Sequence, residues 1–147
     1  MLQRLPAALD GQLQRDEELT HFAYFVLAML SEAPDRALRM SQLASASSSS
    51  PSRLSHTVRR LEERGWVTRT RSADDGRGQV ARLTDAGWDK VVATAPGHVE
   101  QVRALVFAGL TAEQVGQLEA IATAIMTRVD GDCADQGFDV TDLPETA

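Results

Sequence analysis

Hydroxyl, imidazole and guanidinium side chains are concentrated in residues 50–60, which read SPSRLSHTVRR. These groups donate hydrogen bonds to phosphate oxygens and to the acceptor edges of bases, and one arginine can contact guanine through two parallel hydrogen bonds. The chemistry that this stretch offers is therefore the recognition of a polyanion, such as a nucleic acid.

An amphipathic helix is predicted to position these side chains. Ser50 fits the N-cap and Pro51 the first helical residue, because the fixed φ of proline suits that position. Gly65 ends the helix. The apolar residues that recur at i, i+4 and i+7 predict a buried stripe made of Leu54, Val58 and Leu61. The opposite and flanking faces then carry Ser52, Arg53, Ser55, His56, Arg59, Arg60 and Glu63.

The distribution of charge supports this interpretation more than the total does. The chain has 147 residues and a net charge of −6, which alone argues against a nucleic-acid partner. Residues 36–82, however, contain ten arginines and four acidic residues, a net charge of +6, so the rest of the chain carries −12. A basic segment in an acidic body can turn one face toward a polyanion. The alternative that acidic residues elsewhere in the fold balance this cluster stays open.

Helices are predicted on the N-terminal side of this segment. Apolar periodicity predicts one helix over residues 2–13 and a second over 17–31, with acidic residues at the start of the second, where the helix dipole favours them. EAPDRA, residues 32–37, predicts a break. Residues 41–46 predict a short helix with Leu43 facing inward.

A hairpin and two long helices are predicted on the C-terminal side. Strands over 66–71 and 80–84 flank the turn-forming SADDGRGQ, which places Arg77 near the hairpin tip. Thr84 can cap the next helix, and a kink or break is expected at Pro96 and Gly97. A Thr-x-x-Gln capping box at 111–114 opens a last helix that runs to Val129.

This order predicts a fold that is mainly α with a small β-hairpin wing, a winged helix-turn-helix plus a helical dimerisation region. Apolar stripes on the first and last helices exceed what so small a module can bury, which favours a homodimer; a monomeric bundle is the alternative. The predicted domains are linking and dimerisation helices at 1–33, the DNA-binding domain at 34–84, dimerisation helices at 85–129 and an acidic, disordered tail at 130–147.

Residues 52–88, SRLSHTVRRLEERGWVTRTRSADDGRGQVARLTDAGW, resemble the core of the multiple antibiotic resistance regulator (MarR) family. The shared features are the Ser-Arg helix, LEERGWV before the first strand, DGR in the wing and LTDAG at the start of the long helix. The resemblance implies a homodimer that binds a pseudo-palindromic operator in double-stranded DNA and usually represses nearby genes. It also matches Asp75 and Arg77 to the Asp-x-Arg pair of the wing, with Asp75 as a structural residue. An arginine at a hairpin tip can enter the minor groove, and an ion pair of Arg77 with Asp74 or Asp75 is the alternative. The serine-rich turn at 47–50 departs from the family pattern.

A small-molecule effector is a further expectation from the resemblance, in a cleft lined by His21, Tyr24 and Phe25. For His21, an interior packing role is the alternative. The single cysteine, Cys133, lies among acidic residues that disfavour a thiolate, so redox sensing is not expected.

Other function classes find little support in the sequence. Catalytic residue sets and metal-ligand spacings are absent, so no enzyme activity, cofactor or metal is expected. No apolar run is long enough to span a membrane, so a cytoplasmic protein is expected. A winged-helix module that binds an acidic protein partner without DNA remains the alternative function.

Overall fold

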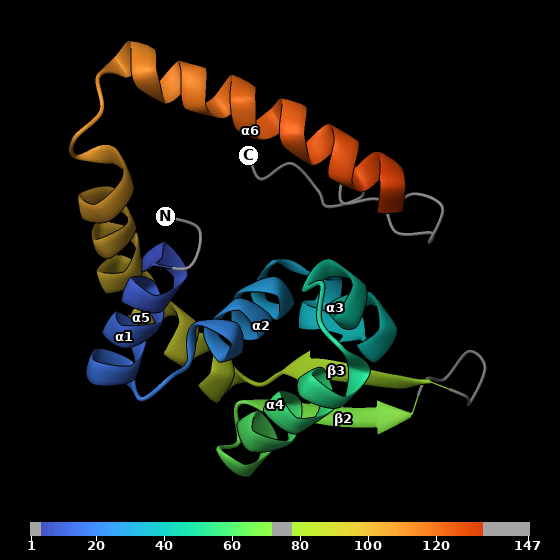
Figure 1. The fold of residues 1–147 in the computed structure, drawn as a ribbon. Coiled ribbons are helices and arrows are strands. Elements are labelled where there is room, and N and C mark those ends of the chain that lie inside the picture. Colours follow the sequence, from blue (N-terminus) through green and yellow to red (C-terminus); the bar gives the residue numbers. More distant parts are fainter. Residues whose placement is uncertain (1–3, 72–77, 134–147) are drawn as a thin grey trace. The chain divides into compact units, whose positions relative to one another are not determined.

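A computed structural model describes residues 4–71 and 78–133 of the chain. The chain divides into two compact units, residues 1–101 and 102–147, and each is described by itself. Figure 1 shows the ribbon coloured along the sequence. None of the described helices is long and apolar enough to cross a membrane.

The first two helices are shifted relative to the prediction. α1 spans Arg4–Glu17 and α2 spans His21–Glu32. The Thr20 hydroxyl accepts a hydrogen bond from the Ala23 amide at 3.1 Å, so the second helix begins at His21, four residues later than predicted. The prediction of acidic residues in its first turn is wrong, because Glu17 ends α1 and Glu18 has a left-handed φ of 54°.

The segment after α2 is more structured than the predicted break. A 3₁₀ turn, η1, covers Pro34–Arg36, and a three-residue strand, β1, covers Ala37–Arg39. β1 pairs with β3, so the sheet has three antiparallel strands in the order β1-β3-β2 instead of the two predicted. A strand this short leaves no alternation that a sequence pattern could detect.

The helix-turn-helix pair follows the prediction closely. α3 spans Met40–Ala46 and α4 spans Pro51–Glu63. A Schellman motif satisfies two of the carbonyls at the end of α4: the Gly65 amide donates to the Glu62 carbonyl at 2.8 Å and the Trp66 amide donates to the Leu61 carbonyl at 3.0 Å. Gly65 has a φ of +73°, a conformation that glycine adopts without a steric penalty.

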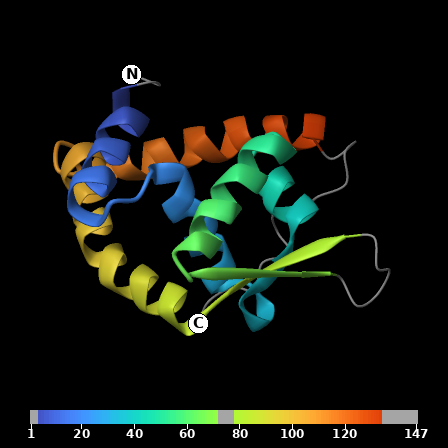
Figure 2. The ribbon, with the colours of Figure 1, turned by 90° about the horizontal axis from the view of Figure 1, so that it is seen from below.

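The sheet carries the wing strands and leads into α5. β2 spans Val67–Arg71 and β3 spans Gln79–Leu83, with Thr70 opposite Val80 and Val67 opposite Leu83. The predicted wing tip at 72–77 lies outside the described residues. In Figures 1 and 2, α4 lies along the hairpin, and α5 leads away from the end of β3 to lie beside α1.

α5 spans Asp85–Val102 and continues through Pro96 and Gly97, so of the kink or break predicted there, the break is absent. Thr84 caps the helix as predicted, because its hydroxyl accepts from the Gly87 amide at 3.0 Å. Contacts to α1 hold α5 on both sides of the proline. Lys90 forms an ion pair with Glu17 at 2.6 Å, and His98 Nδ1 lies 3.3 Å from Gln12 Oε1.

The core of the first unit lies between α2, α4 and the sheet. Val26, Leu27 and Leu30 of α2 are fully buried, as are Leu43 of α3 and Ala81 of the central strand. Burial of an apolar side chain of this size contributes about 1.5–3 kcal/mol, so the cluster supports the arrangement of these elements. The predicted fold class, mainly helical with a winged helix-turn-helix, is confirmed.

The second unit contains η2, a π-helical turn over Arg103–Phe107, and the helix α6 over Ala112–Cys133. The capping box at Thr111 and Gln114 is confirmed by reciprocal hydrogen bonds of 2.9 and 3.3 Å. α6 extends four residues into the segment predicted to be a disordered tail, and the rest of that tail, 134–147, lies outside the described residues. The predicted domain boundaries stay predictions.

Candidate nucleic-acid interface

α4 has one buried side and one exposed side, as its sequence predicts. Leu54, Val58 and Leu61 are 0–2% exposed and pack in the core. The side chains on the other side, here called the polar face of α4, are all exposed; they are Ser52, Arg53, Ser55, His56, Arg59 and Arg60. The helix is therefore anchored from behind while its polar side chains stay accessible to a ligand.

The N-terminal end of α4 is shaped by serine side chains. The Ser50 hydroxyl accepts from the Arg53 amide at 3.3 Å, which confirms Ser50 as the N-cap. In the preceding turn, the Ser47 hydroxyl donates to the Leu43 carbonyl at 2.6 Å and lies 2.8 Å from the Ser49 hydroxyl. Ser48 has a left-handed φ of 46°. The serine-rich turn is therefore held by its own hydroxyl groups.

Three residues of α4 form a chain of polar contacts along the exposed side. One terminal nitrogen of Arg59 lies 3.2 Å from His56 Nδ1, and Arg59 Nε lies 3.8 Å from a carboxylate oxygen of Glu63. Because a guanidinium can only donate, this bond requires the His56 tautomer in which Nδ1 accepts and Nε2 carries the hydrogen. The Nε2–H group is then a donor suited to an acceptor atom of a base or to a phosphate oxygen.

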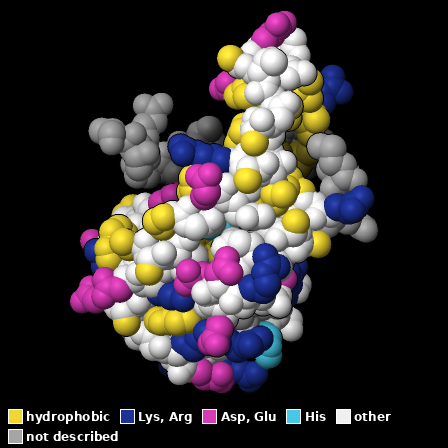
Figure 3. All heavy atoms as spheres, turned by 90° about the vertical axis from the view of Figure 1, so that its left-hand side faces the viewer, with side chains coloured by type: hydrophobic (Ala, Val, Ile, Leu, Met, Phe, Trp, Pro, Cys, Tyr) yellow, Lys and Arg dark blue, Asp and Glu magenta, His cyan; other side chains and the backbone are white. Residues whose placement is uncertain are grey.

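Acidic residues compensate part of the basic charge. Glu62 pairs with Arg69 of β2 at 2.6 Å, and Glu63 pairs with Arg59. Figure 3 shows basic side chains next to acidic ones across the lower part of the face that it presents, rather than an unbroken basic surface. The cations of this region for which the described residues show no ion pair include Arg53, Arg60 and Arg71.

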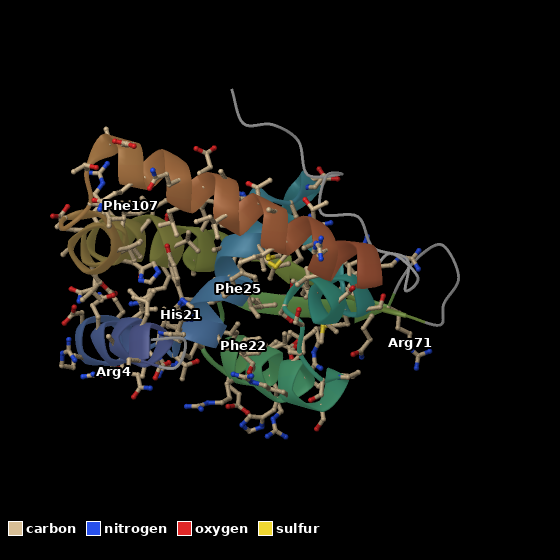
Figure 4. All side chains as sticks on the ribbon, turned by 45° about the horizontal axis from the view of Figure 1, so that its top comes forward. Arg4, His21, Phe22, Phe25, Arg71 and Phe107 are labelled. Carbon is tan, nitrogen blue, oxygen red and sulfur yellow. The ribbon has the colours of Figure 1, made fainter. Side chains whose placement is uncertain are left out.

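Arg53 contacts an aromatic ring of another helix. Its guanidinium carbon lies 4.3 Å from the ring centroid of Phe22, which is half-buried on α2. Figure 4 shows Phe22 on the side of α2 that faces α4. The contact therefore joins the polar face of α4 to α2, the helix that packs against α4.

A cleft of about 750 Å³ opens between α4, α2 and α1. Its lining includes two residues of the predicted effector site, His21 and Phe25, but not Tyr24. From α4 and its C-cap residue it includes Arg53, His56, Thr57, Arg60 and Arg64. Four of these, at 53, 57, 60 and 64, follow helical spacing, a second stripe beside the apolar one that could have been detected in the sequence.

Tyr24 belongs to a different cluster, centred on His98 of α5. The His98 ring lies 4.9 Å from the ring of Tyr24 and 5.7 Å from the ring of His21, measured between centroids. Burial and the charge of His21 lower the pKa of His98, and burial together with the Glu32 carboxylate raises the pKa of Tyr24. No sequence pattern pointed to His98. It lies 77 positions after His21 in the sequence, and only the tertiary fold brings the two rings together.

The two wing residues of the prediction, Asp75 and Arg77, lie outside the described residues. Arg71, at the exposed end of β2, was not singled out from the sequence; Figure 4 shows it at the far end of the hairpin from α1. Among the described residues, no group of three or more His, Cys, Asp or Glu side chains could hold a metal ion.

Comparisons with known proteins agree on one family. The sequence model of the MarR family matches residues 19–78. The structure is similar to Sco3205, a MarR family transcriptional regulator from Streptomyces coelicolor solved in complex with DNA, with 46% identity and a TM-score of 0.81 over 85% of this chain and 79% of that one. It is also similar to AbsC, a MarR family transcriptional regulator from the same organism, with 35% identity and a TM-score of 0.82 over 88% and 87% of the two chains.

A sequence comparison adds a relative from Bacillus subtilis, the HTH-type transcriptional regulator YdcH, which is 30% identical over 100 residues, 67% of each chain. The chain belongs to the MarR family, as its resemblance predicted. It is a transcriptional regulator of the winged-helix type and not an enzyme.

Proposed function

We propose that this regulator binds a specific sequence of double-stranded DNA, with the polar face of α4 in the major groove. The observation that carries the proposal is the division of α4 into a fully buried apolar stripe and an exposed face of hydroxyl, imidazole and guanidinium groups. An α-helix fits the major groove, where Arg53 or Arg59 can contact guanine and serine hydroxyls can contact phosphates. The 46% identity to a regulator solved with DNA supports the same function.

The regulator acts as a homodimer in this proposal. α6 exposes a stripe of apolar side chains in the single chain, namely Leu118, Ile121, Ile125, Met126 and Val129. Such a stripe favours burial against a second copy. A two-fold dimer would present two copies of α4 to half-sites about 34–36 Å apart, which requires a pseudo-palindromic operator.

We further propose that the bound dimer represses transcription and that a small molecule can release it. The cleft beside α4 supports the second part, because Arg53, His56 and Arg60 line the cleft and also belong to the polar face of α4. A ligand in the cleft would contact side chains that DNA also needs. Of the predicted effector residues, only His21 and Phe25 contribute to this cleft.

Selection of bound sequences from random duplex DNA at one fixed salt concentration tests the proposal. The expected result is an enriched, inverted-repeat motif with half-site centres one helical turn apart. Enrichment of no motif would contradict sequence-specific binding. A single half-site would contradict the two-fold symmetry while leaving DNA recognition by α4 in place.

A further inference from the structure

Phe22 and Arg53 are far apart in the sequence and belong to different helices, yet they form a specific contact. The guanidinium carbon lies 4.3 Å from the ring centroid, well within the roughly 6 Å at which a cation over an aromatic face is attracted to it. Both side chains line the cleft beside α4. The contact is therefore on the side of α4 that is open to ligands.

The backbone of Arg53 is fixed independently of its side chain. Its amide donates to the Ser50 hydroxyl at 3.3 Å, in the first turn of α4, and Leu54 next to it is 1% exposed. Phe22 is fixed in turn, because it packs against the core and is followed by the buried Ala23. The contact thus connects two rigid backbones through one aromatic ring.

A guanidinium carbon 4.3 Å above a ring centroid is compatible with stacking through the guanidinium face, an arrangement that leaves the N–H edge available. The edge is the part that forms two parallel hydrogen bonds with guanine O6 and N7. An exposed arginine otherwise loses a large amount of rotamer entropy when it binds. The ring therefore lowers the cost of holding Arg53 in one position before DNA arrives.

We propose that Phe22 is a positioning residue for DNA recognition, one that orients the Arg53 guanidinium toward a base edge and so contributes to sequence discrimination. The proposal rests on the proposed function. In this proposal, a residue of α2 affects sequence specificity although Phe22 itself does not contact DNA. Affinity for phosphates alone does not depend on the ring, because phosphate contacts tolerate many arginine rotamers.

A double-mutant cycle tests the proposal, with two duplexes as probes: the sequence enriched by selection and a scrambled sequence of equal length. Dissociation constants are measured at one salt concentration for the parent, Phe22→Leu, Arg53→Ala and the double variant. Phe22→Leu keeps an apolar side chain but removes the aromatic face. We expect it to weaken binding to the selected duplex about 2- to 5-fold and to leave the scrambled duplex unaffected.

The double variant gives the decisive comparison. In the Arg53→Ala background, Phe22→Leu should have no further effect on the dissociation constant. In the parent background, Phe22→Tyr keeps the ring and should bind like the parent. Arg53→Lys removes the planar group without removing the charge and serves as a second arm if Arg53→Ala proves unstable. Phe22→Leu should then also add nothing in the Arg53→Lys background.

Three outcomes would overturn the proposal. Phe22→Leu could lower the affinity equally with and without Arg53, or lower it equally for the selected and the scrambled duplex. Phe22→Leu could also bind more tightly than the parent, which would mean that the ring holds the arginine away from DNA. Failure of the proposed function can be distinguished from failure of this inference, because without sequence-specific binding the parent itself would bind both duplexes equally.

Discussion

The backbone carbonyl oxygen of Trp66 lies where a side chain on Gly87 would have to be. A Cβ atom added to Gly87 would be 2.2 Å from that oxygen and 2.7 Å from Leu83 Cδ1. The same Trp66 oxygen accepts the Thr84 amide at 3.0 Å, just before α5 begins. The glycine of the LTDAG motif therefore permits the first turn of α5 to pack directly on the end of the wing strands.

Gly87→Ala should accordingly destabilise the protein, although alanine is the better helix former. We expect the free energy of unfolding, measured by urea denaturation, to fall by about 1–3 kcal/mol. Gly11→Ala in α1 is the matched control, because the nearest atom to its Cβ would be the mobile Arg15 guanidinium at 3.3 Å. That variant should be neutral or more stable by up to about 1 kcal/mol. Equal effects of the two substitutions would contradict the close packing at Gly87.

The stability of the fold should depend on pH through His98. Burial and the charge of His21 lower the pKa of His98 in the folded chain, below the ordinary value of about 6.5 that applies when unfolded. Between these two values the unfolded state binds more protons, so the stability contribution is complete above about pH 6.5 and is lost as the pH falls through the folded pKa. A non-titrating variant, His98→Gln, should lack this loss.

The measurement is chemical denaturation of the parent and His98→Gln at several pH values between about 5 and 8. The difference in free energy of unfolding, parent minus variant, should decrease as the pH is lowered below about 6.5. Parallel curves for the two proteins would show that the His98 cluster, formed with Gln12, His21 and Tyr24, does not couple folding to proton binding.

Glu63 should weaken DNA binding in the parent protein. Its carboxylate lies 3.8 Å from Arg59 Nε, and both side chains are about two-thirds exposed, at 66% and 60%. Glu63→Gln would remove a negative charge from the proposed DNA-binding side of α4 and release Arg59, so we expect about 2- to 5-fold tighter binding at low salt and a smaller gain at high salt. Glu32→Gln, on α2, changes the net charge equally and should have little effect. Unchanged or weaker binding by Glu63→Gln would contradict this prediction and would mean that the Glu63 carboxylate does not lie in the DNA interface.

The exposed stripe of α6 should be required for dimerisation. Ile121 and Ile125 are 58% and 57% exposed in the single chain, so introducing Ile121→Glu with Ile125→Glu should place charges within the proposed interface. We expect sedimentation or light scattering to report a monomer for this double variant and a dimer for the parent. Ala120→Glu with Thr123→Glu adds the same charge on the opposite side of α6 and should remain dimeric. A dimer in both double variants would place the interface elsewhere.

The features that local chemistry determines were predictable from the sequence. Ser50 and Thr84 caps, the apolar stripe of α4 and the glycine at 65 each depend on neighbouring residues alone, and the structure contains all of them. Family membership followed from the same segment, because its motifs lie within a single continuous stretch.

Features that depend on tertiary contacts were missed or predicted wrongly. β1 exists because it pairs with β3, more than 40 residues later. α5 continues through Pro96, and contacts to α1 lie on both sides of the proline, whereas intrinsic helix propensity disfavours an interior proline. The contacts of Phe22 with Arg53 and of His98 with Tyr24 join helices whose relative placement no periodicity reveals.

Binding of Arg59→Ala to the selected duplex tests the central claim most directly. Arg59 is exposed on the polar face of α4, opposite the buried stripe, so its removal should leave the fold intact while weakening operator binding by about 1–3 kcal/mol. Arg4→Ala, which removes an exposed arginine from the start of α1, controls for net charge. Fluorescence anisotropy at one salt concentration should show a loss of at least about 5-fold for Arg59→Ala and little change for Arg4→Ala. Parent-like affinity of a correctly folded Arg59→Ala protein would contradict the assignment of this face to DNA.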